Sequence, residues 1–335
     1  MTVTQQYPAG MTEVAEAGLD ELLERHRREL TAHCYRMLGS SFEAEDAVQE
    51  TIVRAWQHSD SLQGAGALKS WLYRIATNVC LDMLRGRQRR AQPMDLGGSS
   101  SADAFDGKVL PENVWVTPIP DYRVVPDDGD PAELAAQRET IRLAFVAALQ
   151  ALPARQRAVL ILCEVLQWKA SEVAELLGTS VAAVNSALQR ARASLQAADV
   201  ADAGDGALSE HDRELLARYV DAFERYDMDA LTALIHEDAT QSMPPYELWL
   251  SGRQDILRWW VGPGAACRGS RVLATVAANG APAFGQYKPS ESGSGYDPWA
   301  LQVLEVAGGR IVEITFFLAT DTIFPLFGLP PRLQA

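Results

Sequence analysis

The sequence predicts a multidomain protein. Two all-α domains, the second containing a helix-turn-helix, precede an α+β domain. The 335-residue chain is long enough for two or three domains of about 100–200 residues each. Apolar residues recur at helical spacing up to residue 197, and a proline-rich acidic stretch divides that region in two. After residue 208, helical patterns give way to strand-like runs separated by turns.

Composition narrows the class of protein. Hydrophobic residues make up 47% and charged residues 22%, as in ordinary folded domains. No apolar run approaches the ~18 residues of a membrane span, and the first residues lack the pattern of a signal peptide. The four cysteines are far apart and lack metal-site spacing. We therefore expect a cytoplasmic protein with reduced cysteines, no metal and no cofactor.

The net charge of −14 is unevenly distributed. Residues 93–137 hold nine acidic and two basic side chains, and residues 198–335 hold nineteen acidic and ten basic ones. Residues 66–92, in contrast, carry six basic side chains and the single acid Asp82. Because a phosphate senses charge within a Debye length of ~8–10 Å, this local basic stripe leaves nucleic acid open as a partner.

The first helical domain is predicted at residues 19–92, after an N-terminal extension at 1–18. Leu19, Leu23, Leu30 and Leu38 are among the apolar residues spaced along one helical face, which a Gly-Ser-Ser break ends. In chain order we expect helices at residues 19–38, 42–56 and 68–90, with a loop at 59–66.

Residues 93–137 form the predicted linker. Six prolines and the excess of acids leave too little apolar surface to offset the entropy of ordering, so we expect a tether. Val114, Trp115, Val116 and Ile119 are unusual for a linker and indicate one local docking point.

The second helical domain is predicted at residues 138–197. Gly178 separates the amphipathic segments SEVAELL and SVAAVNSALQRARASL, which is the pattern of a helix-turn-helix. Ser171 and Thr179 are candidate N-caps. We expect Val181, Val184 and Leu188 to face inward.

The third domain is predicted at residues 209–322, after a linker at 198–208 and before a tail at 323–335. Helices come first and strands follow, which is typical of an α+β domain. We expect helices at residues 209–225, 228–236 and 253–260, and strands at 271–276, 282–288, 299–306 and 310–318.

Three motifs occur in a fixed order. They are EDAVQE at residues 45–50, WLYRIATN at 71–78 followed by Asp82, Leu84 and Arg85, and the segment from LPARQ to LQRAR at 152–192. Together they resemble the polymerase-docking, promoter-melting and fourth conserved regions of sigma-70 factors of the extracytoplasmic-function (ECF) class. The resemblance implies a transcription initiation factor that binds core RNA polymerase and promoter DNA. Its DNA target would be double-stranded at an upstream element and single-stranded at a downstream element.

Promoter melting requires that extruded bases be held, since unstacking costs a few kcal/mol per base. By resemblance, Leu62, Gln63 and Gly64 would line the base pocket and Asn78 would contact a neighbouring base. Lys69 and Arg74 would contact phosphates. Arg85 and the arginines after it, Arg87, Arg89 and Arg90, would add a less specific electrostatic contribution.

The other two motifs imply further contacts. By resemblance, Asp46, Gln49 and Glu50 would bind a basic coiled coil of the large polymerase subunit. The second helix of the helix-turn-helix would enter the major groove by its N-terminal half. Its outward-facing residues, which suit contacts with bases or phosphates, are Ala182, Asn185, Ser186, Gln189 and Arg190. Asn185 and Ala187 stand where many members carry a basic residue, so we expect modest affinity for the upstream element.

Residues 209–322 resemble the SnoaL-like domain, a cone-shaped α+β fold with a central pocket, and the whole chain resembles the SigG type of ECF factor. We expect a regulatory role for this domain, because its excess of acidic side chains would let it pack against the basic DNA-reading surfaces, and any pocket ligand is unknown. Trp259 is a further aromatic candidate for the lining. The candidate pocket residues are Asp238, Trp249, Arg253, Trp260, Tyr287 and Trp299.

Two other functions stay open at this point. The first is a ligand-sensing helix-turn-helix regulator that binds DNA without polymerase. The second is a polyketide-cyclase-type enzyme with a DNA-binding appendage, which would need an acid–base pair facing into the pocket. His236 and Asp238 are its candidates, although we do not expect them to face each other. We expect no enzymatic activity.

Overall fold

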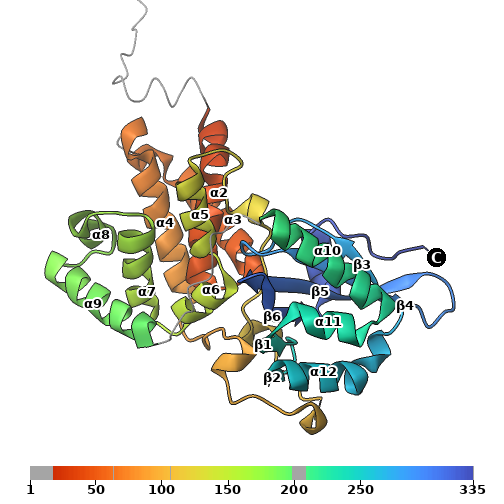
Figure 1. Ribbon diagram of the computed structural model, residues 1–335. Coiled ribbons are helices and arrows are strands. Elements are labelled where there is room, and N and C mark those ends of the chain that lie inside the picture. Colours follow the sequence, from red (N-terminus) through yellow and green to blue (C-terminus); the bar gives the residue numbers. More distant parts are fainter. Residues whose placement is uncertain (1–17, 63, 106, 198–208, 335) are drawn as a thin grey trace, which may run out of the picture. The chain divides into compact units, whose positions relative to one another are not determined.

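The computed structural model describes residues 18–62, 64–105, 107–197 and 209–334 (Figure 1). Its contacts divide the chain into two compact units. Of the described residues, the first unit contains those up to residue 88 together with 123–128 and 148–197. The second contains residues 89–122 and 129–147 and those from residue 209 onwards. Among the described helices, none combines the length and the apolar character needed to cross a bilayer.

The first unit begins with three helices, α2 (Leu19–Leu38), α3 (Ser41–Gln57) and α4 (Leu68–Met83), which pack against one another. Gly39, at φ +68°, ends α2, and the Ser40 side chain accepts a hydrogen bond from the Glu43 amide to cap α3. The predicted helix at residues 68–90 is longer than the observed α4. Helix α4 ends at Met83, and a turn with Gly86 at φ +73° follows.

Arg85, Arg87, Arg89 and Arg90 therefore lie beyond the end of α4. Arg87 pairs with Glu43 in the first unit. Arg90, in the second unit, is buried and donates hydrogen bonds to the carbonyls of Trp115, at 2.7 Å, and Glu112. The expectation that Arg90 contributes to a DNA-binding helix end is wrong, since its guanidinium stabilises the chain itself.

The rest of the first unit holds α7 (Ala154–Leu160), a π-helical turn, α8 (Ala170–Leu176) and α9 (Val181–Ala197), with Val173 and Val184 buried between the last two helices. The expected helix-turn-helix is present, but its caps are displaced. Lys169 is the N-cap of α8, where its amide donates to Glu172, and Ser180 accepts from the Ala183 amide at α9. Val181 is 44% exposed and does not face inward as expected.

A buried arginine joins the two helical parts of this unit. Arg157 on α7 is 3% exposed and donates to the carbonyls of Met37, Gln150 and Leu152. A guanidinium that satisfies several carbonyls within the protein fixes α7 against the end of α2.

The acidic, proline-rich stretch is not a tether. Trp115, Val116 and Ile119 are 3% exposed or less, so the expected docking point is present. The Ser100 and Leu110 amides also donate to carbonyls of the third domain, those of Trp249 and Pro245. Its described residues contain four short 3-10 turns and the first part of α5 (Pro131–Glu139), and α6 (Leu143–Gln150) follows the stretch. Backbone hydrogen bonds, which composition does not reveal, hold Ser100 and Leu110 on the second unit, to which all of the stretch except residues 123–128 belongs.

The α+β part of the second unit has a six-stranded sheet in the order β2-β1-β6-β5-β4-β3. β1 runs parallel to β6, and all other neighbours are antiparallel. Helices α10 and α11 lie over one face of the sheet (Figure 1), and α13 packs against β5. The elements are α10 (Glu210–Arg225), α11 (Met228–Leu234), β1 (Ile235–Ser242), β2 (Trp249–Ser251), α12 (Arg253–Val261), β3 (Arg271–Ala274), β4 (Ala283–Pro289), β5 (Tyr296–Ala307), β6 (Arg310–Phe317) and α13 (Thr320–Leu326).

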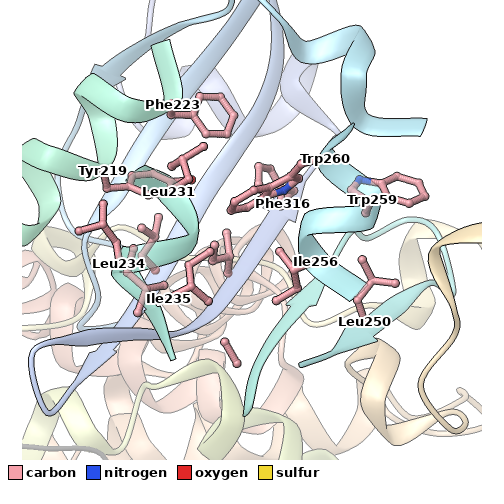
Figure 2. Close-up of a cluster of buried hydrophobic side chains, with 14 of the residues drawn as sticks. Tyr219, Phe223, Leu231, Leu234, Ile235, Leu250, Ile256, Trp259, Trp260 and Phe316 are labelled. Carbon is pink, nitrogen blue, oxygen red and sulfur yellow. The ribbon is translucent and has the colours of Figure 1, made fainter. Parts of the chain in front are cut away.

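The sequence analysis did not predict strands β1 and β2. Residues 235–242 show no regular alternation of buried and exposed side chains, so the pattern lacks the usual strand signal. The core is formed where α10, α11 and α12 meet the sheet. Figure 2 shows Phe223 and Leu231 on one side of this core, Trp260 and Phe316 in its middle and Trp259 on the other side.

Candidate functional site

The exposed face of α4 carries three of the expected DNA contacts. Arg74 and Asn78 are exposed and lie one helical turn apart, and Lys69 is exposed at the start of the helix. Lys69 Nζ lies 2.6 Å from a Glu29 carboxylate oxygen and 5.9 Å from the centre of the Tyr73 ring. Arg85 has an 81% exposed side chain and pairs with Asp82.

The loop before α4 holds the expected base-binding residues. Leu62 and Gly64 are partly buried, with Gly64 at φ +97°, and Gln63 lies outside the described residues. The loop ends in a 3-10 turn at Ala65–Ala67 that leads directly into α4. The described part of the loop is therefore adjacent to the basic helix.

A polar groove of about 430 Å³ lies between α4 and α8. Lys69 and Arg74 line one side, and Glu172 and Glu175 line the other. Arg74 donates to Glu175 at 3.1 Å, with both side chains well exposed. Arg74, which we expected to contact a phosphate, therefore pairs with a carboxylate of the helix-turn-helix. This contact joins distant parts of the sequence, so the α4 motif alone did not reveal it.

The exposed side of α3 combines acidic, polar and apolar residues. Asp46 and Gln49 are exposed, and the exposed Glu50 pairs with Arg54. Glu45 instead holds the first unit together through Arg27, at 3.4 Å, and Arg123, at 3.2 Å.

Sequence reasoning missed the apolar members of this face. Phe42, Val53 and Trp56 are 39%, 48% and 48% exposed, at steps of three and four residues with Asp46 and Gln49. The sequence did contain a signal for these residues, because they are apolar and regularly spaced but do not belong to the buried face of the helix. Their spacing is the periodicity of a helix that packs on another helix. We call Phe42, Asp46, Gln49, Val53 and Trp56 the α3 stripe.

Helix α9 presents its expected residues to solvent. Val184 and Ala191 are buried on the opposite side. Arg192, further along, pairs with Glu164. The exposed residues, which form one face over the first turns of the helix, are Ala182, Asn185, Ser186, Gln189 and Arg190.

The second unit contains a cavity of about 170 Å³ between its helices and the sheet. Trp259, Trp260 and Trp299 line it as expected. The other lining residues, mostly apolar, are Phe105, Phe223, Tyr226, Met228, Leu231, Gln241, Met243, Tyr246, Pro263, Gly264, Ala266, Cys267, Lys288 and Phe316.

Four expected pocket residues lie outside this lining. Asp238 is exposed on β1, where its amide donates to His236 Nδ1, because residues 235–242 form a strand and not a helix end. The Trp249 indole donates to the Gly97 carbonyl, and Arg253 donates to the Ile235 carbonyl. Tyr287 is buried and donates to the Pro330 carbonyl. Trp249, Arg253 and Tyr287 therefore stabilise the fold through hydrogen bonds to backbone carbonyls.

Besides the tyrosine hydroxyls and the indole nitrogens, the described lining offers the polar side chains of Gln241, Lys288 and Cys267. Gln241 accepts a hydrogen bond from the Trp260 indole at 2.9 Å. Lys288 Nζ lies 3.4 Å from the centre of the Trp299 ring. Burial raises the pKa of the Cys267 thiol. The described lining contains no carboxylate or histidine, and the described residues contain no cluster that could hold a metal ion.

Each unit also buries a titratable group whose pKa is shifted. In the first, burial lowers the pKa of His33 to about 3, and its Nε2 lies 3.0 Å from Thr77 Oγ1. In the second, burial raises the pKa of Glu305 to about 8, even though Arg142 pairs with it.

Comparisons with known proteins agree with this architecture. Residues 22–90 match the family model of sigma-70 region 2, residues 142–195 that of sigma-70 region 4, and residues 216–314 that of the SnoaL-like domain. The chain is 47% identical over 316 residues to the ECF RNA polymerase sigma factor SigG of Mycobacterium tuberculosis, covering 92% of this chain and 83% of that protein.

A second relative shares the arrangement. The ECF RNA polymerase sigma factor SigJ of Mycobacterium tuberculosis is 30% identical over 217 residues, which are 65% of this chain and 62% of that protein. The crystal structure of SigJ covers 93% of this chain and 100% of its own, with a TM-score of 0.59 and 22% identity, and so shows a similar fold. The chain therefore belongs to the ECF RNA polymerase sigma factors, as a member with a C-terminal SnoaL-like domain.

Proposed function

We propose that this sigma factor divides initiation among three exposed helix faces. The α3 stripe binds core RNA polymerase, α9 recognises a double-stranded upstream promoter element, and α4 with the preceding loop holds the melted downstream element. The observation that carries this proposal is the face of α4, where Arg74 and Asn78 are exposed beside a loop. A face with cationic and amide groups suits phosphates and unpaired bases.

The α3 stripe supports the first part of the proposal. Exposed apolar side chains flank Asp46 and Gln49, and exposed apolar groups are typical of binding surfaces. A helical, basic partner would bury Val53 and Trp56 and pair with Asp46. Glu50 would first have to give up its contact with Arg54, which at a surface costs little.

Promoter binding would also open the groove between α4 and α8. The Arg74–Glu175 pair places a carboxylate where a phosphate would lie. Both side chains are solvated, so we expect DNA phosphates to displace Glu175 at a cost of at most about 1 kcal/mol.

The SnoaL-like domain, in this proposal, regulates and does not catalyse. Its described cavity lining lacks the carboxylate or histidine that general acid–base catalysis uses, and Asp238 is on an exposed strand face. Regulation is supported by the hydrogen bonds that hold the stretch between the sigma regions on this domain. We place the protein in the cytoplasm, where core polymerase and the promoter are found.

Run-off transcription with purified core polymerase tests the proposal. Fragments of genomic DNA serve as template, so that the promoter need not be known. We expect specific transcripts only when polymerase and this protein are both present. Specific DNA binding by the protein alone would favour the ligand-sensing regulator instead, and turnover of a polyketide that Asp238→Asn abolishes would favour the enzyme.

A further inference from the structure

The cavity of the second unit has the size and lining of a small-molecule site. Its volume of about 170 Å³ is comparable to the roughly 150 Å³ apolar cavity that admits benzene. Aromatic side chains from α10, α12, β5 and β6 surround it, among them Phe223, Trp260, Trp299 and Phe316. Flat aromatic walls favour a ring that can stack or meet them edge-on.

One side chain sets the charge that the cavity prefers. Lys288 is the single charged residue of the described lining, and no carboxylate lies within ion-pair distance of it among the described residues. It rests on the Trp299 ring, which stabilises a cation but does not neutralise it. An ammonium group beside an apolar cavity gains most from an anionic partner.

A second donor points to the same chemistry. Gln241 is 1% exposed, and its side-chain oxygen already accepts from the Trp260 indole. Its side-chain N–H groups take no part in that bond and donate no hydrogen bond within the described part of the chain. Gln241 therefore offers its amide hydrogen-bond donors to whatever occupies the cavity.

One wall of the cavity comes from outside the SnoaL-like domain. Phe105, in the stretch between the two sigma regions, meets Tyr246 and Trp259 edge-on at centroid distances of 5.1 and 5.0 Å. It follows a short 3-10 turn whose Ala102 is buried in the same core. The occupant of the cavity would therefore touch the segment that connects the promoter-binding regions.

We propose that this cavity binds a small aromatic carboxylate. The ring packs among the aromatic walls, the carboxylate pairs with Lys288, and Phe105 covers the ligand. This inference goes beyond transcription initiation and does not depend on it. The inference names the class of ligand that the cavity of the second unit would bind. Because Phe105 belongs to the stretch between the two sigma regions, the bound ligand would contact that stretch directly.

Fluorine NMR on the full-length protein tests the proposal with two probes of similar shape. They are 4-fluorobenzoate and its uncharged counterpart, 4-fluorobenzyl alcohol. We expect saturable binding of the benzoate, at least about tenfold tighter than that of the alcohol, because a charge-assisted contact to Lys288 is available only to the anion.

Three variants determine where the probe binds. Lys288→Met should remove the preference for the anion, and Ala266→Phe, which enlarges a side chain of the cavity lining, should weaken binding of both probes. Arg213→Met removes the same charge from the exposed surface of α10 and should change nothing. Circular dichroism checks that each variant is folded.

Several outcomes would overturn the proposal. They are no saturable binding of the benzoate, equal affinity for the two probes, or benzoate binding that is not weakened in either folded cavity variant. Loss of benzoate affinity in Arg213→Met equal to that in Lys288→Met would also overturn it, because attraction to general positive charge would then explain the preference. None of these results bears on transcription, so failure here is distinguishable from failure of the initiation role.

Discussion

The two units keep their functional groups in opposite places. In the first, candidate contacts lie on exposed helix faces, with Asn78 and Gln189 open to solvent. In the second, the candidate site is a cavity that is only partly open to solvent, and Gln241 and Lys288 are among the polar groups that line it. An exposed face suits a macromolecule, which brings its own large surface, whereas a cavity suits a small ligand that can be largely buried. The comparison teaches that one chain can carry both kinds of recognition without mixing their residues.

The largest expected effect on the binding of a partner concerns the α3 stripe. Val53→Asp places a charge in an exposed apolar position and should weaken binding to core polymerase at least about tenfold, while leaving the fold intact. Fluorescence anisotropy with labelled protein measures the affinity. Val261→Asp, at a 58% exposed position of α12, is the matched control. If both substitutions weaken polymerase binding equally, the α3 stripe is not a specific binding surface for polymerase.

The next effect tests whether the connecting stretch is part of the second unit. Ile119 is fully buried, so Ile119→Ala should lower the free energy of unfolding by about 2–5 kcal/mol. Val109→Ala, at a 56% exposed position in the same stretch, should change it by less than about 0.5 kcal/mol. Denaturant unfolding gives both values. A negligible effect of Ile119→Ala would restore the tether interpretation.

The sequence predicted the exposed sites better than the cavity, for a physical reason. A helix-turn-helix and the basic helix α4 are local patterns, so helical spacing together with the family resemblance predicts most of their surface residues, with Val181 as an exception. The cavity instead combines Phe105, Gln241, Lys288 and Trp299, which are far apart in the sequence and meet only through the sheet. Asp238 was misplaced because pairing with β2 and β6 overrides a segment that lacks strand periodicity.

Acidic pH should destabilise the first unit through His33. Burial lowers its folded-state pKa to about 3 from the ordinary histidine value of 6.5, and the nearby Arg36 reinforces the lowering. The neutral imidazole therefore favours the folded state above pH 6.5, and this stabilisation is lost as the pH falls from 6.5 towards 3. His33→Gln should flatten that part of the stability profile, measured by unfolding at a series of pH values.

A rise in pH from acidic to neutral values should destabilise the second unit through Glu305. Burial raises its pKa to about 8, Arg142 opposes the rise, and Glu313 and Glu139 add to it. Because the folded state holds the proton more tightly than the unfolded state, stability declines as the pH rises from about 4.5 to 8. Glu305→Gln should reduce this slope. The same slope in wild type and variant would contradict the assignment of the proton to Glu305.

The smallest expected effect is at the groove between α4 and α8. Glu175→Gln removes the partner of Arg74 and should increase affinity for promoter DNA by a few-fold at low salt, and less at high salt. Glu214→Gln, an exposed change of equal charge on α10, is the control. If both variants gain the same affinity for promoter DNA in a polymerase-dependent binding assay, the gain comes from the overall charge and not from release of Arg74.

Sequencing the transcripts from a randomised promoter library, with core polymerase and each of three variants, tests the division of labour most directly. Asn78→Ala should relax base preference only at the downstream element, and Gln189→Ala only at the upstream element. Gln196→Ala, exposed near the end of α9, should leave both preferences unchanged. Unaltered preferences in Asn78→Ala and Gln189→Ala, or transcripts that form equally well without this protein, would contradict the account.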